Sequence, residues 1–87
     1  MVPGNRYAMA HPQLPIEIAK KHIEGIRAGK FNGVQLSGNI ITSPMWAIVD
    51  AALAVQLPIF STLSENAHQQ LQDTMPGVVF HRRTSTG

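Results

Sequence analysis

The chain has 87 residues, a length typical of one domain, so we expect a single unit spanning residues 1–87. Hydrophobic residues make up 44% of it and charged residues only 14%, which excludes an intrinsically disordered chain. Cysteine is absent, so disulfide and thiolate chemistry are excluded, and a cytoplasmic location is expected. The longest apolar stretch, residues 44–60, is broken by Asp50 and Pro58 and predicts no membrane span, and residues 1–6 do not resemble a signal peptide.

The formal net charge is +2, and the positive residues gather in two places. One group lies on a predicted helix and its end, and the other follows the last predicted strand: Lys20, Lys21, Arg27 and Lys30, then Arg82 and Arg83. Only five aromatic residues are present, most of them within apolar runs, which disfavours binding of an extended nucleic-acid duplex. A small anionic ligand needs fewer donors, and this chain can supply them.

The first half of the chain predicts strand, helix, strand and helix. Residues 7–10 are the remnant of a first strand, and residues 15–28 form an amphipathic helix that ends at a left-handed Gly29. The inner face of this helix is predicted to carry Ile16, Ala19, Ile23 and Ile26. Residues 33–38 form a short strand, and Ser43 caps a buried, nearly all-apolar helix that begins at Pro44 and ends at residue 56.

The second half continues the alternation. Residues 57–61 are predicted as a strand, Ser64 and Glu65 open a helix that ends near Met75, and residues 78–81 form a last strand before a frayed tail at 84–87. Because parallel strands need crossover connections, this order predicts an α/β fold with a small, mostly parallel, Rossmann-like sheet and helices packed on it.

The segment from Ser37 to Pro44 is the most informative for function, because it leads from a strand end through Gly38 to a helix N-terminus. In open parallel sheets, ligands bind beyond the carboxyl ends of the strands, where helix N–H groups attract phosphate. We therefore expect ligand contacts from Ser37, Gly38, Asn39, Thr42 and Ser43. The alternative is an ordinary strand-to-helix connection. The segment has no G-x-G-x-x-G or Walker pattern, so dinucleotide cofactors and ATP hydrolysis are not predicted.

Among the histidines, none has the spacing of a metal site, and His22 and His68 lie on predicted helices. His81 ends a strand beside Arg82 and Arg83, and such a group can hold a phosphodiester and stabilise the charge that builds during its cleavage. The alternative is a strand edge protected by charge. Asp50 lies within the apolar helix, where we expect it to pair with an arginine or face a cavity.

Four short motifs together resemble the small CRISPR-associated ring-nuclease family that binds cyclic oligoadenylate in antiviral defence. They are the strand at 33–38, Pro44-Met45-Trp46 at a helix start, the strand after Pro58, and Gly77-Val78-Val79-Phe80. The resemblance covers about residues 15–83. It implies a homo-dimer or tetramer that grips a cyclic oligonucleotide between subunits, with manganese-dependent cleavage in some members.

The family's catalytic residues are not matched. Where the family carries histidines late in a helix, this chain has Val55 and Gln56, and where it has an Asp-Pro-Arg turn, this chain has the helix at 64–75. The hypothesis is therefore binding of cyclic oligoadenylate at a subunit interface, with His81 as the best candidate catalytic acid or base and His68 as the other histidine that could take this role. The alternatives are a non-catalytic sensor or sequestering protein for the same ligand, and a structural interaction domain that uses the apolar helix at 44–56.

Overall fold

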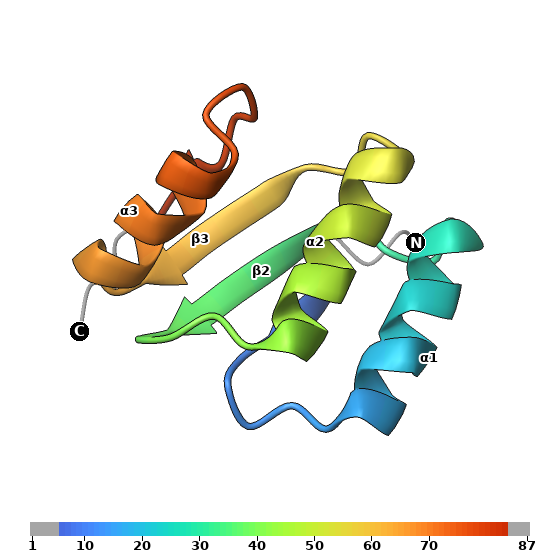
Figure 1. Cartoon of the computed structure of the whole chain (residues 1–87). Coiled ribbons are helices and arrows are strands. Elements are labelled where there is room, and N and C mark those ends of the chain that lie inside the picture. Colours follow the sequence, from blue (N-terminus) through green and yellow to red (C-terminus); the bar gives the residue numbers. More distant parts are fainter. Residues whose placement is uncertain (1–5, 84–87) are drawn as a thin grey trace.

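The computed structural model describes residues 6–83, in which strands and helices alternate along the chain (Figure 1). The strands are β1 (Tyr7–Ala10), β2 (Gly33–Gly38), β3 (Ile59–Leu63) and β4 (His81–Arg82), and the helices are α1 (Ile16–Arg27), α2 (Ser43–Ala54) and α3 (Glu65–Thr74). All strand pairs are parallel, and the sheet order is β1-β2-β3-β4. The predicted α/β class with a parallel, Rossmann-like sheet is confirmed.

The strand order determines where the helices lie. Each strand is followed in the sheet by the next one in the sequence, and right-handed crossovers then place every connecting helix on the same face. Figure 1 shows α1, α2 and α3 together on one side of the sheet. Burial alternates accordingly: in β2, Val34 and Leu36 are fully buried toward the helices, whereas Gln35 between them is half-buried on the other side. The sheet therefore has one covered face and one open face.

The core lies between the sheet and α2, the most apolar helix. Met45, Ile48, Val49 and Ala52 on this helix are fully buried. Asp50 is exposed, so the expectation that it pairs or faces a cavity is wrong. Although the helix is apolar nearly all round, it still turns one stripe to solvent, and Asp50 lies on that stripe.

Several predicted boundaries shift by one to three residues. Thr42, not Ser43, is the N-cap of α2, and β3 begins and ends two residues later than expected. The last strand comprises only His81 and Arg82. Ile16 is 47% exposed at the start of α1 and does not belong to the inner face, while Gly29 has the expected left-handed φ of 74°.

Two further expectations concern the membrane and the chain end. Within residues 6–83, no helix is long and apolar enough to cross a bilayer. The predicted frayed tail at 84–87 lies outside the described residues.

Candidate functional site

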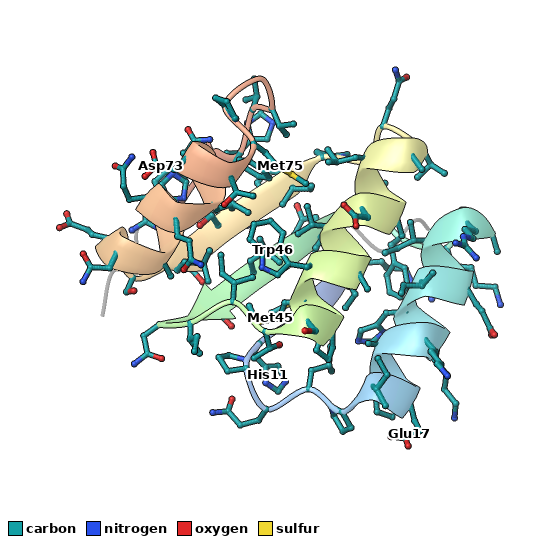
Figure 2. The ribbon with its side chains drawn as sticks, viewed as in Figure 1. His11, Glu17, Met45, Trp46, Asp73 and Met75 are labelled. Carbon is teal, nitrogen blue, oxygen red and sulfur yellow. The ribbon has the colours of Figure 1, made fainter. Side chains whose placement is uncertain are left out.

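The carboxyl ends of the parallel strands meet at one edge of the sheet, where three loops pack together. Gly38 ends β2 with a φ of 110°, and a Cβ atom at this position would lie 2.5 Å from Cδ of Pro12 in the loop after β1. The Gly38 carbonyl accepts a hydrogen bond of 2.9 Å from the N–H of Ser64, which follows β3. Gly38 thus joins the β1–α1 loop to the start of α3. His11 lies in the β1–α1 loop at this edge (Figure 2).

The loop after β2 is open to solvent. Gly38, Asn39 and Ser43 are exposed, and Ser37 and Thr42 are half-buried, so none of the five predicted contact residues is sealed in the core. Within the described part of the chain, no backbone hydrogen bond uses the N–H groups of Asn39 or Ser43. These two amides can therefore serve a ligand.

Other groups at the start of α2 are less suited to an anion. The Thr42 N–H donates to Sδ of Met45 at 3.4 Å, and Pro44 has no N–H. The Thr42 hydroxyl oxygen is buried and has no hydrogen-bond partner among residues 6–83. The helix start therefore offers fewer donors than its position alone would suggest.

A second polar group lies at the neighbouring strand ends, around the fully buried Ser61 of β3. Nδ1 of His68 on α3 lies 2.9 Å from the Ser61 hydroxyl oxygen. That oxygen also accepts from the N–H of Leu63 at 3.3 Å and from the guanidinium of Arg82 at 3.4 Å. Because these two bonds occupy both lone pairs of the hydroxyl oxygen, the remaining contact uses its single proton, and Nδ1 of the imidazole is the acceptor.

Arg82 is held in place by the backbone of β3. Its guanidinium donates to the carbonyl oxygens of Leu63 and Ser61 as well as to the Ser61 hydroxyl. Partial burial lowers the pKa of His68 from its ordinary value of 6.5, and the positive charge of Arg82 lowers it further. His68 is therefore neutral at pH 7, and its Nε2 carries the ring proton.

An open pocket of about 400 Å³ lies beside this group. Its lining consists of Glu65, Asn66, His68, Gln69 and Arg82. A guanidinium, a neutral imidazole, a carboxylate and two amides thus surround one space at the N-terminal half of α3. This set can bind an oxyanion through Arg82 and exchange protons through His68 and Glu65.

The structure separates the predicted His-Arg-Arg group between two faces of the sheet. Arg82 points toward α3, whereas the exposed His81 packs its ring 5.2 Å from that of Phe60. Arg83 places its guanidinium 4.1 Å from the same Phe60 ring. Since side chains alternate along a strand, residues 81 and 83 share the open face and residue 82 faces the helices. His68, and not His81, shares a pocket with Arg82.

The sequence offers His68 as the alternative to His81 for catalysis, but it does not predict that His68 meets Ser61 or shares a pocket with Arg82. Ser61 and His68 are seven positions apart across the β3–α3 turn, and only the placement of α3 against β3 brings them together. One feature of the sequence does indicate where His68 lies, namely the helix cap at Ser64. This cap determines where α3 begins, because the Ser64 hydroxyl accepts from the N–H of Ala67 at 3.3 Å.

No group of three or more His, Asp or Glu side chains suited to a metal ion occurs among residues 6–83. Comparison of the chain with family models, with curated proteins and with solved structures found no match.

Proposed function

We propose that the chain binds a phosphate-containing nucleotide at the carboxyl edge of its sheet, and that the ligand is a cyclic oligoadenylate held at a subunit interface. The observation that carries the proposal is the Arg82 guanidinium, fixed by the β3 backbone beside the neutral His68 in an open pocket. The free amides of Asn39 and Ser43 add donors at the same edge. The choice of cyclic oligoadenylate comes from the sequence resemblance.

The subunit interface is proposed at this edge because apolar side chains are exposed there. Ile40 in the β2–α2 loop is 54% exposed, and Ile16 at the start of α1 is 47% exposed. A partner that covers this edge would remove both side chains from water. Two symmetry-related copies would place two pockets around one cyclic ligand.

Cleavage of the ligand is the second part of the proposal. A ribose 2′-oxygen would attack the adjacent phosphorus, forming a 2′,3′-cyclic phosphate while the bond to the 5′-oxygen breaks. One group accepts the proton from the 2′-hydroxyl, and another returns a proton to the leaving 5′-oxygen. His68 and Glu65 are the candidates in the pocket, and His81 is the candidate predicted from the sequence. No protein nucleophile takes part in this scheme.

The test is to incubate the protein with labelled cyclic oligoadenylates and to follow both retention and cleavage. We expect retention by the unmodified chain and loss of at least tenfold in affinity for Arg82→Ala, because a charged hydrogen-bonding partner contributes about 1.5–3 kcal/mol. Arg27→Ala is the matched control, because it removes the same charge from the last turn of α1. No retention, or equal losses in both variants, would refute the proposal.

The histidine variants separate an enzyme from a sensor. If the chain cleaves the ring, His68→Ala should abolish cleavage and spare binding, whereas an effect confined to His81→Ala would assign the role to His81. Retention without cleavage by the unmodified chain identifies a sensor or sequestering protein. The mass in solution tests the interface, since a strict monomer in the presence of ligand excludes an intersubunit pocket.

A further inference from the structure

The open face of the sheet is a second surface with a distinct chemistry. Parallel sheets are usually covered on both faces, yet all three helices here lie on one side (Figure 1). Side chains at alternate strand positions point away from the helices and remain partly or fully exposed among residues 6–83. They include Tyr7, Met9, Gln35, Phe60 and His81.

Three rings form a row across this face. Tyr7 on β1 and Phe60 on β3 have ring centroids 5.3 Å apart, although β2 lies between their strands. Gly33 on β2 makes this contact possible: a Cβ atom there would lie 3.0 Å from the Phe60 ring and 3.1 Å from the Tyr7 ring. The His81 ring on β4 continues the row at 5.2 Å from Phe60. The rings thus reach from one edge of the sheet to the other.

Arg83 lies over this row. Its guanidinium carbon is 4.1 Å from the Phe60 centroid and 5.3 Å from the Tyr7 centroid, and one of its nitrogens donates to the Tyr7 hydroxyl at 3.4 Å. The side chain is exposed. A planar cation stacked on a ring presents a flat surface on which a further planar group can stack.

The distribution of charged residues makes the open face positive. All five acidic residues of the chain lie on the helices: Glu17, Glu24, Asp50, Glu65 and Asp73. Among residues 6–83, the open face therefore has no acidic side chain to balance Arg83. An anionic partner fits this face, and a cationic one does not.

We infer that the open face binds single-stranded nucleic acid, with bases stacked on the row of rings and on the Arg83 guanidinium, and with the phosphates near the Arg83 charge. Stacking on exposed rings beside a cation is how sheet surfaces bind single strands without a groove. The half-buried Gln35 amide can hydrogen-bond to base edges. A duplex does not fit, because its bases are already stacked and hidden from a flat surface. This site is separate from the pocket at the carboxyl edge.

A second copy of the chain is the competing occupant, and the charges disfavour it. A two-fold interface uses the same patch on both subunits. Covering the open face with itself would bury two copies of Arg83 with no acidic side chain from residues 6–83 of either copy, which is costly.

The test uses the full chain and fluorescein-labelled single strands of about 12 nucleotides, oligouridylate and oligoadenylate, followed by fluorescence anisotropy at two salt concentrations. Phe60→Leu keeps an apolar side chain over Gly33 but removes the ring, and Arg83→Ala removes the cation. We expect each to weaken binding about 5- to 150-fold, the range for loss of one stacking contact. Arg27→Ala is the charge-matched control and should change affinity less than about twofold.

Four outcomes decide the inference. Selective loss in Phe60→Leu and Arg83→Ala, with weaker binding of a duplex of the same length, supports it. Absence of binding up to about 100 μM protein overturns it, since even non-specific binding reaches that range. Equal losses in Arg83→Ala and Arg27→Ala overturn it in favour of general charge attraction. If the unmodified chain is a dimer that Phe60→Leu dissociates, and the chain does not bind nucleic acid, the open face is the interface with a second copy.

Two controls keep this result independent of the proposed function. Arg82→Ala should leave single-strand binding unchanged, because Arg82 points toward α3 on the covered face. The fluorescence of Trp46, which belongs to α2 and packs against the core on the covered side, reports whether each variant is folded (Figure 2).

Discussion

Nδ1 of His68 lies 2.9 Å from the hydroxyl oxygen of the fully buried Ser61, and this bond fixes the imidazole of α3 against β3. The same hydroxyl accepts from Arg82 on β4, so three neighbouring elements meet at one oxygen atom. A serine so buried cannot act as a nucleophile. Its role is to orient the imidazole beside Arg82 at the pocket.

Removal of the Arg82 charge should raise the pKa of His68. Burial is the larger cause of its lowered pKa and Arg82 is the smaller one, so Arg82→Gln should move the pKa up without restoring the ordinary value of 6.5. The measurement is an NMR titration of the His68 ring proton in both proteins. Arg27→Gln serves as the control. An unchanged or lower pKa in Arg82→Gln would show that the guanidinium does not act on this ring.

The same shift predicts how stability depends on pH. The folded chain binds the His68 proton less tightly than the unfolded chain does, so the unfolded state holds more protons below pH 6.5. The contribution of His68 to stability is therefore complete above pH 6.5 and is lost as pH falls through that value toward the lowered folded pKa. Urea titrations between about pH 5 and pH 8 should show this decline, and His68→Gln should flatten it. An equal slope in both proteins would contradict the assignment.

The strand at 33–38, the helix opened by Ser64 and the parallel sheet could all be predicted, because each follows from local signals. Gly33–Gly38 is a short run after an Asn-Gly turn with the apolar Val34 and Leu36 at alternate positions, and Ser64 with Glu65 is a strong helix start. Pattern alone could not locate the exposed stripe of α2, since an almost wholly apolar helix shows no preferred face. Asp50 was misplaced for that reason.

The candidate site was less predictable than the fold, because its residues come together only through tertiary contacts. His81, Arg82 and Arg83 are adjacent in sequence, and that adjacency suggested one group. The alternation of a strand sends Arg82 to one face and its neighbours to the other. A last strand at 78–81 contains His81 but neither arginine, so the predicted alternation of side chains does not extend to Arg82 and Arg83.

Three glycines should respond differently to alanine. Gly38→Ala combines a φ of 110° with a Cβ atom 2.5 Å from Pro12, so we expect a loss of about 2–5 kcal/mol in the free energy of unfolding. Gly29→Ala meets no atom within 4 Å but keeps a φ of 74°, and should lose only about 1–2 kcal/mol. Gly77→Ala has neither problem and should be within about 0.5 kcal/mol of the unmodified chain or slightly more stable.

Urea unfolding of the three glycine variants, followed by Trp46 fluorescence, gives this ranking directly. If Gly38→Ala were as stable as Gly77→Ala, the close packing of the β2–α2 loop on Pro12 would be absent. The proposed ligand site would then lack the rigid edge that holds its loops together.

The two helix starts at the carboxyl edge should also respond in opposite directions. The Ser64 hydroxyl accepts from the N–H of Ala67 at 3.3 Å, so Ser64→Ala removes a capping bond and should cost about 1 kcal/mol. The buried Thr42 hydroxyl has no hydrogen-bond partner among residues 6–83, so Thr42→Val, which replaces it with a methyl group, should be neutral or stabilising by up to about 1 kcal/mol. Urea unfolding of both variants measures the difference. If Thr42→Val instead lost as much stability as Ser64→Ala, the Thr42 hydroxyl would accept from the N–H of Met45 in solution, completing the capping box whose other half is the bond from the Thr42 N–H to Sδ of Met45.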